Sequence, residues 1–164
     1  MSFTPTWSMA AEILEAELCY SIVGAFFEVF HYFGPGLPEY VYKKALEIVL
    51  RERGHKVVRE LVVEIWFKNH LLGTKRLDMV VEDRVVVELK AKEQLTEHDK
   101  AQTPTYLSVT KFEVGLLLHA GLMADWKRYI DSPKRQHRLA PIARPRSQTE
   151  GTSACQHLDG SSPD

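Results

Sequence analysis

The spacing of the apolar residues changes from a helical to an alternating period near Gly54. This change predicts that the chain begins with helices and continues with the first strands of a sheet. Over residues 9–33, apolar side chains recur every three or four positions, which predicts a long amphipathic helix. The Gly-Pro-Gly break at 34–36 ends this helix. A second helix is predicted over 37–53, because Gly54 supplies a C-terminal stop.

The alternating region predicts three strands joined by short connections. Residues 57–67 are rich in β-branched side chains and place apolar residues on one face and charged residues on the other. After a turn over 69–73, strands are predicted over 75–81 and 85–91, connected through residues 82–84. These segments start an antiparallel meander.

A helix, a strand and a short final helix are predicted to complete the folded part, over residues 97–109, 112–118 and 123–130. Thr96 and Asp99 have the spacing of an N-cap residue and a carboxylate at the third helical position. Pro104 lies inside the predicted helix and is expected to bend it, because proline removes a backbone donor.

The composition of the 164-residue chain is that of one globular domain with a tail. Residues 131–164 contain four of the eight prolines and few aliphatic side chains, so this segment buries too little apolar surface to offset its ordering entropy. We therefore expect a flexible N-terminus over 1–8, a single domain over 9–130 and a disordered tail over 131–164.

The charge, the cysteines and the hydropathy of the chain bear on which partners and which cell compartment we expect for it. The 21 basic and 22 acidic residues give a net charge of −1, without the overall basic signature of a dedicated nucleic-acid binder. Cys19 and Cys155 stand apart without a metal-ligand pattern, which indicates free thiols in a reducing compartment. The sequence has neither a run of about 20 apolar residues nor a secretory signal, so we expect a cytoplasmic protein without a membrane partner.

The stretch that could carry chemistry is RLDMVVEDRVVVELK, residues 76–90. In a strand, side chains two apart share a face, so Glu88 and Lys90 are neighbours. The plainer interpretation is a half-exposed hairpin with a charged outer face. The alternative is a Mg²⁺ site, since this ion takes hard oxygen ligands, which Asp78, Glu88 and Glu39 could supply. Such an ion polarises a phosphate and lowers the pKa of a bound water, and the Lys90 ammonium could stabilise that water as the nucleophile.

The connection over 82–84 decides whether two of these carboxylates can meet. Directly opposed residues of an antiparallel hairpin share a face. A three-residue or bulged connection places Asp78 opposite Glu88, whereas a two-residue connection places Asp78 opposite Val87. The metal-site interpretation therefore requires the odd or bulged connection.

Glu39 lies in the stretch GLPEYVY, residues 36–42, on the same helical stripe as Tyr42 and Leu46. An unpaired carboxylate on a buried face is costly or becomes protonated, so a partner is expected. A helix cap or a salt bridge is the ordinary explanation. The metal site is the other, and it predicts that Glu39 projects toward the sheet, within one metal ion's reach of Asp78.

The motifs also resemble those of a known group of enzymes. Asp78 followed by Glu88-Leu89-Lys90 resembles the D…(D/E)xK core of the PD-(D/E)XK nuclease superfamily, although Leu77 stands where the superfamily name has proline. The stretch QTPTY, residues 102–106, resembles the QxxxY element of the RecB-type branch. Residues 22–121 are similar to the small bacterial and archaeal GxxExxY family, whose name matches Gly36, Glu39 and Tyr42.

This resemblance implies an α/β fold (α+β by some schemes) with a restriction-endonuclease-like core, in which helices flank a mixed central sheet of about four strands. It also implies a centre that binds Mg²⁺ or Mn²⁺ through Glu39, Asp78, Glu88 and the backbone carbonyl of Leu89. Lys90 would assist the attacking water.

The resemblance gives Gln102 and Tyr106 the role of orienting the substrate or the catalytic lysine. The two residues are four apart, and therefore lie on one helical face. For Tyr106, a core aromatic with a satisfied hydroxyl is the alternative. Pro104, between them, departs from a regular helix and affects the alignment of Gln102 with the site.

Two functions from different classes follow. The first is a Mg²⁺- or Mn²⁺-dependent nuclease that hydrolyses phosphodiester bonds in DNA, or in RNA. The second is a catalytically weak or inactive nuclease-like module for nucleic-acid binding or protein interaction. The combination of Glu39, Asp78, Glu88 and Lys90 favours the first, whereas the near-zero net charge and the small size favour the second. A second copy of the chain or a partner protein could supply further binding surface.

Overall fold

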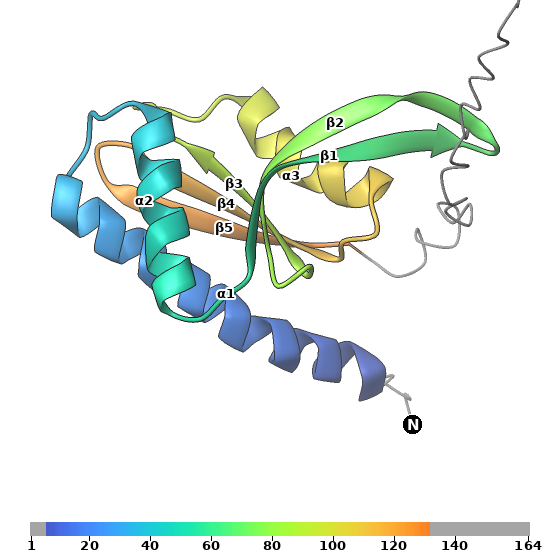
Figure 1. The fold of residues 1–164 in the computed structure, drawn as a ribbon, viewed down its shortest axis with the longest axis horizontal. Helices are drawn as coiled ribbons and strands as arrows, with labels where there is room; N and C mark the ends of the chain where they lie inside the picture. The colour runs from blue at the N-terminus through green and yellow to red at the C-terminus, as the bar shows by residue number, and fades with distance from the viewer. Residues whose placement is uncertain (1–5, 132–164) are drawn as a thin grey trace, which may run out of the picture.

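The computed structural model describes residues 6–131, which form a five-stranded mixed sheet flanked by three helices (Figure 1). In chain order the elements are α1 (Thr6–Phe33), α2 (Glu39–Glu52), β1 (Val57–Phe67), β2 (His70–Val81), β3 (Val85–Lys90), α3 (Glu97–Val109), β4 (Val114–Ala120) and β5 (Ala124–Ile130). The expected α/β fold with helices around a mixed sheet is confirmed, and β5 is an additional strand.

The strands lie in the order β1-β2-β3-β4-β5. Within this sheet β3 and β4 are parallel, with α3 as the crossover between them, and the other neighbours are antiparallel. The long hairpin of β1 and β2 extends beyond the rest of the sheet (Figure 1). Helices cover both sides of the central strands β3 and β4, which explains why these two strands are buried almost throughout.

Two apolar cores lie on the two faces of the sheet. The larger core joins α1 and α2 to the sheet and includes Phe26 and Leu46. The smaller core lies against α3 and includes Leu107. Successive side chains of β3 point to opposite faces of the sheet, so Val87 belongs to the larger core and Val86 to the smaller one.

The link between α1 and α2 is held by Tyr42. The glycines of the Gly-Pro-Gly break have φ angles of 69° and 97°, in the left-handed region that glycine adopts without steric cost. The Tyr42 side chain is fully buried, and its hydroxyl donates to the Gly34 carbonyl and accepts from the Leu37 N–H. Tyr42 thereby fixes the place at which α2 begins.

The prediction of a short helix over 123–130 is wrong. This segment forms the edge strand β5, which pairs with β4 along its whole length, from Ala124 opposite Ala120 to Ile130 opposite Val114. Aromatic and β-branched residues are frequent in it and suit a strand. This composition and backbone pairing with the buried strand β4 together explain why the segment is a strand and not the predicted helix.

Smaller differences concern the ends of the elements. The predicted turn over 69–73 is too long, because β2 already begins at His70. Helix α3 runs through Pro104 to Val109, and the predicted cap at Thr96 and Asp99 is confirmed as a capping box. Helix α1 begins at Thr6, inside the expected flexible N-terminus, while residues 1–5 and nearly all of the expected tail, 132–164, lie outside the described part.

Between residues 6 and 131, no helix is long and apolar enough to cross a membrane.

Candidate active site

Asp78 and Glu88 lie opposite each other at the point where β2 and β3 separate. The strands pair at Val81–Val85, Val80–Val86 and Met79–Val87, and three residues, 82–84, connect them. The first two of these, Glu82 and Asp83, have positive φ angles of 54° and 53°. The odd connection is therefore present, and the same register carried one position further brings Asp78 opposite Glu88. Among the described strands the ladder stops before this pair.

The backbone on the other side of Asp78 is also irregular. β1 pairs with β2 at Arg59–Met79 and at Leu61–Leu77, and the described ladder skips Glu60, which has a φ angle of 50°. A non-glycine residue in the left-handed region is uncommon and often marks a functional constraint. Asp78 thus has no regular backbone partner in either neighbouring strand, β1 or β3, within the described ladders.

Glu88 is the most buried of the predicted site carboxylates, with a side chain only 1% exposed. Its Oε1 lies 2.6 Å from Nζ of Lys90, while Oε2 has no hydrogen-bond partner in the described part of the chain. Burial, and then the nearby charge of Asp78, raise the pKa of Glu88 to about 7. The side chain therefore exchanges its proton near neutral pH and has a carboxylate oxygen available for a cation.

Lys90 follows Glu88 on the same face of β3, as the alternation predicts. Burial alone would lower the pKa of the Lys90 ammonium, but the hydrogen bond and charge of Glu88 outweigh burial and raise it. Lys90 is therefore a cation at neutral pH, held beside the buried carboxylate.

Asp78 and Glu39 both contact a residue that the sequence reasoning missed, Lys43. Its Nζ lies 2.7 Å from Oδ2 of Asp78 and 2.6 Å from Oε1 of Glu39. Burial alone would lower the pKa of Lys43, but hydrogen bonds to Asp78 and Glu39 raise it. Lys43 is one turn after Glu39 in α2, and this i,i+4 spacing is the signal that the sequence offered.

Backbone donors of β3 and the residue after it also reach the two carboxylates. The Leu89 N–H donates to Oδ2 of Asp78 at 3.3 Å, and the Ala91 N–H donates to Oε2 of Glu39 at 3.4 Å. Glu39, the first residue of α2, is therefore directed at the end of β3, although its side chain is one-third exposed. The role of the Leu89 carbonyl as a ligand stays a prediction.

Gln102 and Tyr106 lie together on α3. The Gln102 amide donates to the Tyr106 hydroxyl, and the Tyr106 ring is buried in the smaller core. Burial raises the pKa of Tyr106, and the charges of Glu88 and Asp78 add to this effect. Pro104 does not separate the two residues, because α3 is continuous around it.

The carboxylates of Glu39, Asp78 and Glu88 suit a divalent ion by their chemical type, but their positions do not form a complete metal site. Among the side chains described over residues 15–131, no group of three or more Asp, Glu, His or Cys residues is arranged to hold a metal ion. The oxygens of Glu39, Asp78 and Glu88 are nevertheless the hard ligands that Mg²⁺ and Mn²⁺ prefer, and the buried Oε2 of Glu88 needs a partner. The residues fit such an ion by their chemistry, while two lysines form ion pairs with them in this structure.

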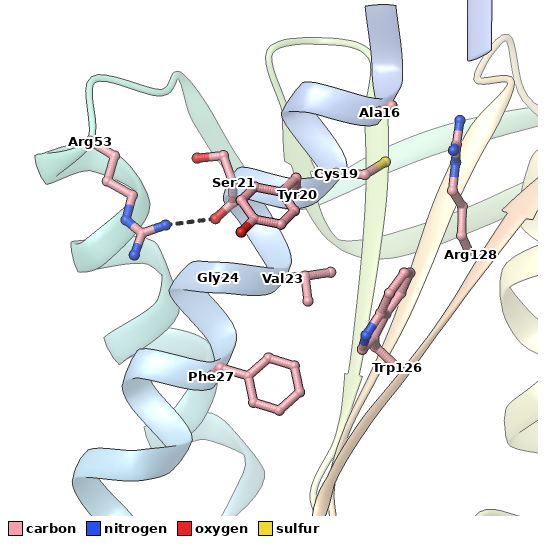
Figure 2. A pocket seen from close by; sticks show the side chains of 10 residues that line it. All are labelled: Ala16, Cys19, Tyr20, Ser21, Val23, Gly24, Phe27, Arg53, Trp126 and Arg128. Carbon is pink, nitrogen blue, oxygen red and sulfur yellow. Dashed lines mark hydrogen bonds between the residues drawn. The ribbon is translucent and has the colours of Figure 1, made fainter. Parts of the chain in front are cut away.

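A separate pocket of about 710 Å³ lies between α1 and β5 (Figure 2). Tyr20, Phe27 and Trp126 contribute apolar surface to it, and Arg53 and Arg128 lie at its margin. The described residues that line it include none of those predicted for catalysis.

A family model described as the PD-(D/E)XK nuclease superfamily matches residues 16–129, a range that contains every predicted site residue. A comparison with curated protein sequences finds no match. Among solved structures, the crystal structure of SSO0001 has a TM-score of 0.46 and 18% sequence identity, over 62% of this chain and 54% of that chain. The chain thus spans about half the length of that protein.

Proposed function

Because the chain belongs to the PD-(D/E)XK nuclease superfamily, we propose that it hydrolyses phosphodiester bonds in nucleic acid, DNA above all, with the help of Mg²⁺ or Mn²⁺. One observation carries this proposal. Asp78 is next to the last paired residues of β2 and β3, on the side of Glu88, Lys90 lies 2.6 Å from Glu88, and Glu88 has a buried carboxylate oxygen without a hydrogen-bond partner among the described residues.

The residues that would hold the ion are Glu39, Asp78, Glu88 and, through its carbonyl, Leu89. When bound, a divalent ion polarises the phosphate and lowers the pKa of a water ligand. Lys90 keeps a positive charge beside Glu88, where it can orient the attacking water and stabilise negative charge that develops on the phosphate. Its raised pKa supports this electrostatic role over that of a base.

The finer assignment to a RecB-like branch and to the GxxExxY family is part of the same proposal. Gln102 and Tyr106 are hydrogen-bonded to each other, and the charges of Glu88 and Asp78 act on the Tyr106 hydroxyl, which supports a role in orienting the substrate. Tyr42 has another role, because its hydroxyl is used to hold the link before α2. Glu39 is thus the functional member of the GxxExxY motif, and Tyr42 positions it.

A nuclease-like binding module without turnover is the second candidate. It is favoured by Lys43 and Lys90, which partly neutralise the site carboxylates, and by the chain's net charge of −1. Binding a long nucleic acid on so small a domain would then depend on a second copy of the chain or on a partner protein.

The test is cleavage of single-stranded, double-stranded and branched DNA, and of RNA, in Mg²⁺ or Mn²⁺. The wild-type chain is compared with Asp78→Asn and Lys90→Met, and Asp83→Asn, in the exposed connection of the same hairpin, is the matched control. We expect both site variants to lose cleavage and the control to keep it. Cleavage that survives in both site variants, or a wild type without cleavage and without a metal-dependent rise in Tm, would contradict the proposal.

A further inference from the structure

The Lys43 ammonium lies between two carboxylates that come from different elements. Glu39 is in α2 and Asp78 is in β2, and Nζ of Lys43 is 2.6 Å from the first and 2.7 Å from the second. The Lys43 side chain is only 16% exposed. The lysine therefore bridges these two elements, and most of its side chain is shielded from solvent.

This bridge uses oxygens that a metal ion would need. Lys43 contacts Oε1 of Glu39, and Oε2 of the same residue accepts from the Ala91 N–H. Oδ2 of Asp78 is shared between Lys43 and the Leu89 N–H. Both oxygens of Glu39 and one of Asp78 are thus engaged in this structure.

The charges also oppose simultaneous binding. Three carboxylates and the ammonium groups of Lys43 and Lys90 give the ionised site a net charge of −1. A divalent ion would make that charge positive in a partly buried place, where like charges repel strongly. Withdrawal of Lys43 from the two carboxylates relieves this repulsion and frees their oxygens.

We propose that Lys43 is an internal counter-ion that occupies the divalent-metal position between Glu39 and Asp78, and that a metal ion must displace it to bind. This inference rests on the metal site of the proposed function. Lys43 then has two effects: it holds Glu39 near Asp78 in the metal-free protein, and it weakens the affinity of the site for the ion.

Lys44 provides a matched control within the same helix. It is the next residue of α2, and its ammonium lies over the ring of Tyr40, 5.8 Å from the ring centre. Replacing either lysine removes one positive charge from the same helix, but only Lys43 bridges the two carboxylates among the described ion pairs.

The experiment is a calorimetric titration of the full chain with MnCl₂ at fixed pH and ionic strength, with Tm measured over the same metal concentrations. The variants are Lys43→Met, Lys43→Gln and Lys44→Met. We expect Mn²⁺ to bind both Lys43 variants about tenfold more tightly than the wild type, and to bind Lys44→Met within about twofold of it. Without metal, the Lys43 variants should have a lower Tm, and Mn²⁺ should reduce that difference.

The outcomes separate this inference from the function on which it rests. Unchanged or weaker Mn²⁺ binding in folded Lys43 variants overturns the counter-ion role and leaves the metal site standing. Absence of Mn²⁺ binding in the wild type and in all variants overturns both. Tighter binding that persists after Asp78→Asn is added to Lys43→Met shows that the ion binds elsewhere, and also overturns the inference. Lys43→Gln keeps the test decisive if Lys43→Met does not fold.

Discussion

Asp78 and Glu88 face each other across a hairpin that no longer pairs at their position. The regular ladder of β2 and β3 ends at Met79 and Val87 within the described strands. The Leu89 N–H is consequently directed at the Asp78 carboxylate, 3.3 Å away. The site therefore lies where the two strands separate, and it combines a backbone N–H group with carboxylate side chains.

The raised pKa of Glu88 predicts a pH dependence of stability in the metal-free protein. The folded chain binds this proton more tightly than the unfolded chain, because the pKa is about 7 in the fold against 4.5 for an ordinary glutamate. The contribution of Glu88 to the unfolding free energy is therefore largest below pH 4.5, and it declines as the pH rises toward 7. The decline is on the order of 2 to 3 kcal/mol.

Urea unfolding at pH 5 and pH 7.5, in the presence of a chelator, checks this expectation. Glu88→Gln cannot ionise, so its stability should fall less between the two pH values than that of the wild type. The same pH dependence in both proteins would show that burial of Glu88 does not control it.

The capping box of α3 should contribute more to stability than Glu97, the other acidic residue of this helix. Asp99 accepts from the Thr96 N–H, and the ion pair with Lys92 and the bonds from Thr96 hold the pKa of Asp99 well below its ordinary value. This stabilisation is complete above the ordinary aspartate pKa and is lost as the pH falls toward the lower pKa of the folded state. Thr96→Ala and Asp99→Ala should each cost about 1 kcal/mol or more at pH 7.

Glu97→Ala is the control for this effect. Glu97 lies in the same first turn, but it is exposed and pairs with Lys100. Thermal unfolding at pH 7 and pH 3.5 should show a larger pH-dependent loss for Asp99→Ala than for Glu97→Ala, whose pair with Lys100 is exposed. Equal losses in the two variants would contradict the assignment of the cap.

The contact between α3 and β4 depends on the absence of a side chain at Gly115. A Cβ atom there would lie 2.5 Å from Cγ2 of Thr103 and 3.4 Å from a methyl carbon of Leu107. Gly115→Ala should therefore destabilise the fold by about 1 to 3 kcal/mol. Thr103→Ser removes the obstructing methyl group and should restore part of the loss.

A double-mutant cycle in urea unfolding measures this coupling. Gly73→Ala is the control, since a Cβ atom at Gly73 meets no described atom within 4 Å. Strictly additive effects of Gly115→Ala and Thr103→Ser would refute the proposed steric conflict.

Tyr106→Phe tests the role proposed for α3 in substrate orientation. The ring stays in the smaller core, while the hydroxyl that accepts from Gln102 is lost. We expect kcat to fall about tenfold and the unfolding free energy to change by less than about 1 kcal/mol. Tyr129→Phe, which alters another tyrosine packed against the same core, should retain the wild-type kcat. Unimpaired cleavage by Tyr106→Phe would leave Tyr106 with a packing role alone.

The hairpin of β2 and β3 could be predicted from the sequence because a strand has a fixed period of two. Alternation and the three-residue connection together determine that Asp78 and Glu88 share a face. The position of Lys43 could not be derived in this way, since it depends on how α2 packs against the sheet. Nor could β5, an exposed edge strand whose pairing with β4 is a tertiary effect.

The first turn of α2 has a further consequence for the dynamics of the site. Pro38 occupies the N-cap without a side-chain hydrogen bond, and the described side-chain contacts that hold this turn include those of Tyr42, the bridge through Lys43 and the bond from the Ala91 N–H to Glu39. Local opening of the turn would release Glu39 and its counter-ion in one step, without global unfolding. Amide hydrogen exchange of residues 39–43 should therefore slow when Mn²⁺ binds, even if the rest of α2 exchanges as before.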